Sequence, residues 1–179
     1  MSDTRDFTLP AELIEAAEKV IEANRAAGLR IAIAESCTGG LVAAALTEIA
    51  GCSDVFEAGF VTYADEAKTG LLGISEEIVD TFGAVSIAVA WGMAQGALAR
   101  TRADLAVAIT GIAGPAGGSL RKPVGLVVFA RARRDANPKE IMADTREFGD
   151  LGRGGIRRQA ALCALELLMP SFEPAPSPP

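Results

Sequence analysis

The sequence predicts one α/β domain, a three-layer α/β/α sandwich on a mixed, mostly parallel sheet. The chain has 179 residues, a normal size for one compact domain, and half of them are hydrophobic. Only 5% are aromatic, so the apolar content is largely Ala, Val, Ile and Leu, which favours helices packed closely over a sheet. Helical and extended patterns alternate along the chain, as they do in α/β folds. We therefore predict a folded domain over residues 1–169 and a disordered, proline-rich tail over residues 170–179.

The first half of the chain begins with a helical pattern and then alternates. Pro10 suits a first helical position, and the apolar stripe that follows it continues until Gly28 ends the helix. Ser75 and Ser86 are typical N-caps for two later helices. Before them we predict a strand at 30–34, a helix at 40–50 closed by Gly51, a strand at 56–63 and a short helix at 64–72.

The second half of the chain is richer in extended patterns. An uncharged stretch at 81–99 is built from small residues with Gln95 among them, so a buried helix fits it better than a membrane span. The apolar run at 104–110 has the length of a strand that is covered on both faces. After it we predict a glycine-rich loop at 111–118, strands at 124–132 and 141–148, and a last helix at about 155–169.

The composition excludes several kinds of site. The chain has no histidine, so it cannot contain a Ser-His-Asp or Cys-His catalytic group or an imidazole-ligated zinc ion. Its three cysteines lack CxxC spacing, which argues against structural zinc and against a disulfide framework. No basic, apolar signal opens the chain. We therefore predict no metal, no cofactor, no membrane and a reducing, cytoplasmic location.

Charge is distributed unevenly along the chain. Residues 1–100 hold 6 Lys and Arg against 15 Asp and Glu, a net charge of −9, whereas residues 101–179 hold 11 against 8, a net charge of +3, and the two halves sum to −6. An isoelectric point near 4.8 argues against a nucleic-acid partner. The basic excess in the second half can still receive one small anionic ligand.

Two segments lie where strands end, the usual place for ligands in open α/β sheets. In the first, Glu35 to Gly40, a nucleophile is available from Ser36, or from Cys37 if its thiol ionises at the helix N-terminus. The Thr38 hydroxyl and the backbone at Gly39 and Gly40 can approach a ligand closely there. The alternatives are that Ser36 or Thr38 merely caps the helix and that Cys37 is a small buried residue.

The second segment, Thr110 to Gly118, carries glycines such as Gly111 and Gly114 that can cradle an anionic or planar ligand, or simply form a loop. Without histidine, a lysine is the usual activator of a nucleophile. Lys68 lies near the same strand ends, and its alternative is a solvated lysine paired with Asp65 or Glu66. Three arginines at the start of the last helix can grip a phosphate or be surface charge; they are Arg153, Arg157 and Arg158.

Six motifs occur in order along the chain, and together they identify a family resemblance. They are AESCTGG (34–40), GFVTYADEAK (59–68), FGAVS (82–86), AITGIAGPAGG (108–118), KPVG (122–125) and RRQA (157–160). These motifs closely resemble the CinA C-terminal domain family, whose characterised members are nicotinamide-nucleotide amidases. The resemblance covers roughly residues 10–168.

This resemblance implies a metal-free hydrolase that converts nicotinamide mononucleotide to nicotinate mononucleotide and ammonia in pyridine-nucleotide recycling. The matching catalytic positions are Ser36, Lys68 and Thr110, Tyr63 matches a substrate-site tyrosine, and Arg153 matches a position near the substrate phosphate. It also implies an α/β/α sandwich that assembles into homo-oligomers. The alternative function is a nucleotide-binding module without turnover, of the competence/damage-inducible type.

Overall fold

The computed structural model of this chain describes residues 7–137 and 139–170, so residues 171–179 of the predicted tail lie outside it. Within the described residues one sheet has five strands in the order β2-β1-β3-β4-β5. β1 pairs in parallel with β2 and β3, whereas β4 pairs antiparallel with β3 and β5. The sheet is therefore mixed, and β4 alone runs against the other four strands. The strands are β1 (Ile31–Glu35), β2 (Phe56–Val61), β3 (Leu105–Gly111), β4 (Leu126–Arg133) and β5 (Met142–Glu147).

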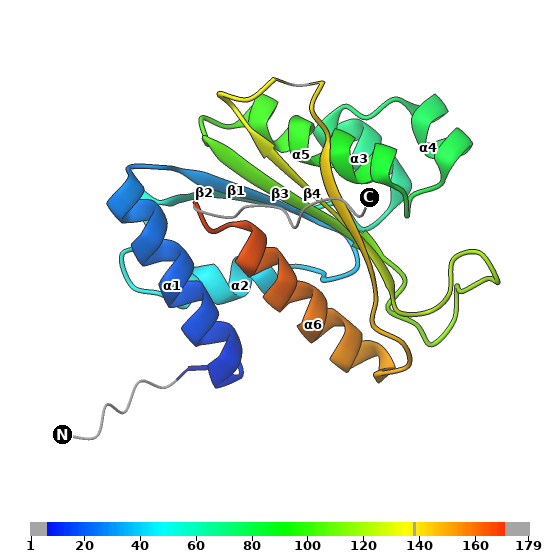
Figure 1. The fold of residues 1–179 in the computed structure, drawn as a ribbon, viewed down its shortest axis with the longest axis horizontal. Coiled ribbons are helices and arrows are strands. Elements are labelled where there is room, and N and C mark those ends of the chain that lie inside the picture. Colours follow the sequence, from blue (N-terminus) through cyan, green and yellow to red (C-terminus); the bar gives the residue numbers. More distant parts are fainter. Residues whose placement is uncertain (1–6, 138, 171–179) are drawn as a thin grey trace, which may run out of the picture.

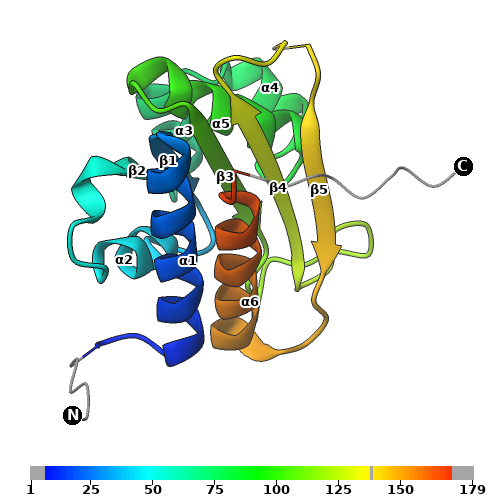
Figure 2. The ribbon, with the colours of Figure 1, turned by 60° about the vertical axis from the view of Figure 1, so that its left-hand side comes forward.

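Helices cover both faces of the sheet, which confirms the predicted three layers (Figure 1). One face packs against α1 (Ala11–Ala27), α2 (Leu41–Thr47) and α6 (Gly152–Leu167). The other packs against α3 (Asp65–Leu72), α4 (Glu76–Phe82) and α5 (Ile87–Arg100). Figure 2 shows α1 and α6 lying side by side over the strands. A single 3-10 turn at Cys52–Asp54 leads from α2 into β2.

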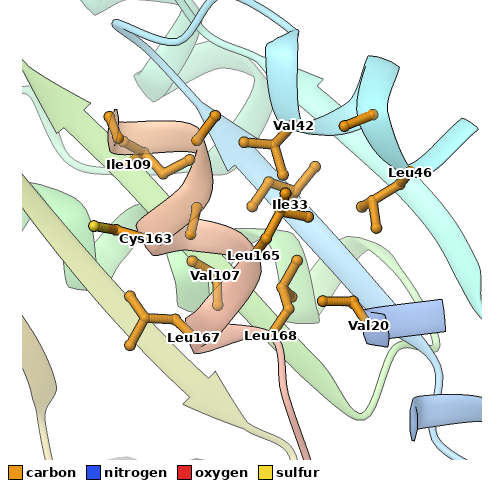
Figure 3. Close-up of a cluster of buried hydrophobic side chains, with 14 of the residues drawn as sticks. Val20, Ile33, Val42, Leu46, Val107, Ile109, Cys163, Leu165, Leu167 and Leu168 are labelled. Atoms are coloured by element: carbon orange, nitrogen blue, oxygen red, sulfur yellow. The ribbon is translucent and has the colours of Figure 1, made fainter. Parts of the chain in front are cut away.

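The two faces of the sheet differ in side-chain size, because large and small residues alternate along the strands. Ile31 and Ile33 of β1 face the α1, α2 and α6 layer, whereas Ala32 and Ala34 face the α5 layer. Figure 3 shows the large-residue side, where Ile33, Val107 and Ile109 meet side chains of α2 and α6. The alanine side lets α5 approach the sheet closely.

Most predicted elements are confirmed, including both serine N-caps. The hydroxyl oxygens of Ser75 and Ser86 each accept a hydrogen bond of 3.3 Å from the backbone N–H three residues later. Gly28 ends α1 in a left-handed conformation with φ of 67°. Within the described residues, none of the helices combines the length and the apolar character needed to cross a bilayer.

Most boundaries differ from the predictions by no more than two residues, and three differences are larger. α2 ends at Thr47, because the chain tightens after it into a turn in which Ile49 N–H bonds Leu46 O over 3.3 Å. α6 begins at Gly152, about three residues earlier than predicted. The uncharged stretch at 81–99 is not one helix, because α4 ends at Phe82 and α5 begins only after Ser86.

Candidate active site

The candidate site is a pocket of about 270 Å³ at one edge of the sheet. The carboxyl ends of β1, β2 and β3 meet at this edge because these strands are parallel. The loop that enters β4 and the start of α6 lie at the same edge. Of the predicted site residues, the pocket lining brings together Ser36, Lys68, Thr110, Tyr63, Gly111, Gly114 and Arg153. Thr38, Gly39 and Gly40 were predicted to contact a ligand and are not part of this lining.

Ser36 lies in a tight turn directly after β1. Its backbone N–H donates to Ile109 O of β3 over 2.9 Å, and its side chain is largely buried. The N-terminus of α2 is capped by the carboxylate of Glu35, which accepts from Gly40 N–H at 3.0 Å and Ala43 N–H at 2.8 Å. The alternative in which Ser36 or Thr38 caps this helix is therefore wrong. Glu35 was not predicted as a site residue, although its position between an apolar strand and a Thr-Gly-Gly segment could have indicated it.

Lys68 has an environment that was predicted only in part. Its side chain is 1% exposed, so it is not the solvated lysine of the alternative interpretation. It is nevertheless paired with Asp65, since Nζ lies 3.0 Å from Oδ1. Nζ also donates to the carbonyl oxygens of Tyr63 at 3.4 Å and Ala64 at 3.5 Å.

Thr110 is buried near the end of β3, between Ser36 and the segment that connects α4 to α5. Its hydroxyl donates to Ala84 O over 2.8 Å. Because this hydroxyl already donates its proton to a carbonyl oxygen, it can act in the pocket only as a hydrogen-bond acceptor. Ala84 and Val85 also line the pocket.

Cys37 also lines the pocket but is poorly suited to act as a thiolate. Burial raises the pKa of its thiol from 9.0 to about 12, and the nearby Glu35 carboxylate adds to this effect. A thiol that keeps its proton at neutral pH is a weak nucleophile. Of the two nucleophiles that the sequence left open, the structure therefore favours the hydroxyl of Ser36.

The three arginines near the start of α6 have different surroundings. Arg153 reaches across the pocket rim, where Nη1 donates to Gly114 O at 2.9 Å and Nη2 to the Tyr63 hydroxyl at 2.6 Å. Arg157 donates to Thr38 O at 2.8 Å, behind the Ser36 turn. Arg158 pairs with Glu12 on the surface at 3.2 Å. Only Arg153 therefore both lines the pocket and keeps N–H groups for a ligand.

The glycine-rich loop supplies several residues to the pocket lining, and close packing explains two of its glycines. A Cβ atom at Gly111 would lie 2.8 Å from Leu126 O, and one at Gly114 would lie 2.6 Å from Val124 Cγ1. Gly114 also has a φ of 75° and precedes a cis bond to Pro115. Glycine therefore lets this loop fold back on the segment before β4. Within the described residues no cluster of three His, Cys, Asp or Glu side chains is arranged to hold a metal ion.

Comparisons with known proteins agree with this architecture. The family model for the CinA C-terminal domain matches residues 13–172. The chain is 49% identical over 162 residues to the nicotinamide-nucleotide amidohydrolase PncC of Escherichia coli K12, covering 90% of this chain and 96% of that protein. It is 50% identical over 155 residues to a CinA-like protein of Syntrophobacter fumaroxidans, covering 86% of this chain but 35% of that longer protein.

A solved structure shares the fold. The competence/damage inducible protein CihA of Agrobacterium tumefaciens superposes with a TM-score of 0.86 at 49% identity, over 90% of this chain and 96% of that one. The chain thus spans nearly the whole of some relatives and about a third of others, such as the Syntrophobacter protein. The family model, the sequence identity and the shared fold agree: this chain belongs to the CinA C-terminal domain family.

Proposed function

We propose that the protein is a nicotinamide-nucleotide amidase, which hydrolyses nicotinamide mononucleotide to nicotinate mononucleotide and ammonia within pyridine-nucleotide recycling. One observation carries the proposal. Ser36, Lys68 and Thr110 come from three separate segments, and all three line one pocket whose rim holds Arg153. The relative from Escherichia coli that bears the name of this activity is 49% identical over almost its full length, which supports the same substrate here.

In this mechanism Ser36 attacks the carboxamide carbon, and its hydroxyl proton passes to neutral Lys68. The resulting tetrahedral intermediate collapses to a nicotinoyl ester of Ser36, and the proton held by Lys68 goes to the departing ammonia. Water then hydrolyses the ester and regenerates the serine. Thr110 orients the proton transfer through the lone pairs of its hydroxyl, since its own proton is bound to Ala84 O.

In this mechanism Lys68 accepts the serine proton as a neutral amine, so its contact with Asp65 must open before the reaction. Nζ lies 3.0 Å from Asp65 Oδ1, and the Asp65 side chain is 53% exposed, so this carboxylate has room to turn toward solvent.

Arg153 makes one end of the pocket positively charged. Its guanidinium forms two hydrogen bonds to the rim, to Gly114 O and the Tyr63 hydroxyl, which leaves further N–H donors for a phosphate. A nucleotide that places its phosphate here directs its other end toward Ser36. The polarity of the pocket therefore fits a substrate with an anionic end and a neutral carboxamide end.

The second candidate function is nucleotide binding without turnover, and the environment of Lys68 is the observation that favours it. All three hydrogen-bond acceptors of Lys68 Nζ lie on residues 63–65, and Ser36 is not among them. A lysine held in this way can be a purely structural cation. Ammonia release from nicotinamide mononucleotide separates the two functions.

The decisive experiment compares two lysine variants in that assay. Lys68→Met removes the base but keeps a long apolar stem that fits the buried position, whereas Lys19→Met changes a lysine on α1, away from the pocket. Loss of general-base help typically costs about 10²–10⁴-fold in rate, so we expect this loss for K68M and parent activity for K19M. Calorimetric titration should show that K68M still binds the nucleotide. Binding by the parent protein without ammonia release would instead establish the second candidate.

A further inference from the structure

Glu35 is a buried carboxylate with no place in the proposed chemistry. Its side chain is 0% exposed at the end of β1, immediately before Ser36. Oε2 accepts from Gly40 N–H at 3.0 Å and from Val42 N–H at 3.2 Å, and Oε1 accepts from Ala43 N–H at 2.8 Å. Burying a carboxylate is costly unless it is well bonded, so three N–H partners indicate a specific role.

Arg157 holds the same turn from its other side. Its Nη2 donates to Thr38 O over 2.8 Å, so the guanidinium binds a carbonyl while Glu35 binds N–H groups. A third attachment is the 2.9 Å bond from Ser36 N–H to Ile109 O. The turn from Ser36 to Gly40 is therefore fixed to α6, to the start of α2 and to β3 at once.

These attachments decide which backbone donors stay available in the pocket. Gly39 N–H bonds Ser36 O at 3.0 Å, and Gly40 N–H is taken by Glu35. Within the described residues no carbonyl or carboxylate oxygen accepts from the N–H groups of Cys37 and Thr38, and the Cys37 N–H has only the sulfur of its own side chain close to it. Cys37 lines the pocket and directly follows the proposed nucleophile, which is where an oxyanion donor is placed in many acyl-transfer sites.

We propose that Glu35 and Arg157 are positioning residues, which together orient the Ser36 hydroxyl and the Cys37 N–H toward the carboxamide of the substrate. This inference rests on the proposed amidase function and deepens it. Neither side chain lines the pocket, so neither contacts the substrate. The Glu35 carboxylate also occupies the N-terminus of α2, which leaves the substrate phosphate to Arg153.

The test separates positioning from stability and from substrate binding. Glu35→Gln keeps the size of the side chain but turns an amide N–H₂ toward N–H groups, and Arg157→Ala frees Thr38 O. Because displacing a reacting group by about 1 Å costs roughly 10²-fold, we expect kcat to fall about 100-fold in each variant while KM stays near the parent value. If E35Q does not fold, R157A carries the same test.

Two matched controls accompany these variants. Ser75→Ala removes an N-cap from α4, and Arg158→Ala removes the neighbouring arginine of α6. Loss of a helix cap lowers the stability of the protein without changing any residue of the pocket lining. S75A therefore measures the effect of destabilisation alone on turnover, and we expect its kcat to remain at the parent value. Unchanged kcat in both E35Q and R157A, or a raised KM with unchanged kcat, overturns the proposal.

A second readout does not depend on the natural substrate. A fluorophosphonate probe labels activated serines, and mass spectrometry locates the modified residue. We expect Ser36 to be labelled in the parent and about 100-fold more slowly in E35Q and R157A, because the same donors stabilise the phosphorus centre. If the parent is labelled but releases no ammonia from nicotinamide mononucleotide, the proposed substrate is wrong and the positioning role stands. If the parent is not labelled at Ser36 and also releases no ammonia, both the proposed function and the positioning role are wrong.

Discussion

Ser36 and Cys37 are adjacent in the same turn, yet burial matters more for the reactivity of the thiol than for that of the hydroxyl. A hydroxyl attacks with help from a neighbouring base and does not have to ionise in advance, whereas a thiol reacts as its thiolate. Burial raises the pKa of Cys37 to about 12, so its thiolate is scarce at neutral pH. The residue that looks more reactive in isolation is therefore the less suitable nucleophile here.

This contrast predicts the order of two alanine variants. Ser36→Ala should abolish ammonia release, whereas Cys37→Ala should keep most of it, since only a small buried side chain is lost. Steady-state assays at neutral pH measure both variants, and iodoacetamide should modify Cys37 of the native protein slowly. Full activity in S36A together with an inactive C37A would show that the thiol is the nucleophile.

A second residue-scale prediction concerns the arginines of α6. Arg153 lines the pocket, whereas Arg158 pairs with Glu12 away from it. A hydrogen bond to a charged group contributes about 1.5–3 kcal/mol, so Arg153→Ala should raise KM for the nucleotide roughly 10- to 100-fold with a smaller effect on kcat. Arg158→Ala should behave like the parent. Equal effects of the two substitutions on KM would show that Arg153 does not bind the phosphate.

At the level of elements, the packing of α5 against α3 determines where Lys68 lies. α5 carries Gly96 at the point of closest approach, and a Cβ atom there would lie 2.3 Å from Leu72 O. α3 carries both Leu72 and Lys68, so a displacement of α3 also moves the proposed base. The small residues of α5 that gave an uncharged stretch in the sequence therefore serve this close contact.

Two glycine-to-alanine variants test this packing. Gly96→Ala forces the two helices apart, and overpacking of this kind costs about 1–3 kcal/mol of stability. Gly70 lies in α3, and a Cβ atom added to it would meet no other atom within 4 Å. Gly70→Ala should therefore stabilise the protein by about 0.5–1 kcal/mol, because glycine loses more conformational entropy on folding. Urea denaturation measures the free energy of unfolding of both variants. Equal stability of the two variants would show that the contact between α3 and α5 is not tight.

The alternation of elements could be predicted from sequence because each one has a local cause. Ser75 and Ser86 accept hydrogen bonds from N–H groups three residues away, and Gly28 takes a left-handed conformation that few other residues adopt. The end of α2 could not be predicted in the same way. Its apolar pattern continues to residue 50, but the chain must turn after Thr47 to enter β2, and that requirement comes from the sheet.

Across the whole molecule, the buried thiol of Cys37 couples stability to pH. The pKa of this thiol is raised in the folded protein from 9.0 to about 12, so the folded state holds the proton more tightly than the unfolded chain. The contribution of this thiol to the free energy of unfolding is therefore fully present below pH 9. It is lost as the pH rises toward 12, because the unfolded chain releases the proton first. The slope contributed by one such group approaches about 1.4 kcal/mol per pH unit.

The predicted consequence is a measurable difference between the parent and Cys37→Ala at alkaline pH. The free energy of unfolding of the parent should fall more steeply between about pH 9 and pH 11 than that of C37A. Urea denaturation at a series of pH values gives both curves, and their difference cancels the groups that the two proteins share. Parallel curves would mean that Cys37 titrates in the folded protein much as it does in the unfolded chain.

Local patterns in the chain were enough to predict the fold class, most of the elements and a site where the strands end, with Ser36 and Lys68 among its candidates. The roles of Tyr63 and Thr110, and the choice of Arg153 among three arginines, came from the family resemblance. The local patterns were enough because periodicity, caps and glycines act over a few residues, and because strand ends in a parallel sheet meet at one edge. The composition also excluded histidine chemistry outright, since the chain contains no histidine.

The interactions among those residues followed only from the folded arrangement. It buried Lys68 while pairing it with Asp65, one of the two partners that the sequence offered, and it left Thr38, Gly39 and Gly40 outside the pocket lining. It gave each of the three arginines of α6 different partners, and it revealed Glu35 as the cap of α2. The burial of Lys68 and the partners of Arg153, Arg157 and Arg158 depend on segments far apart in the chain, and no local pattern carries that information.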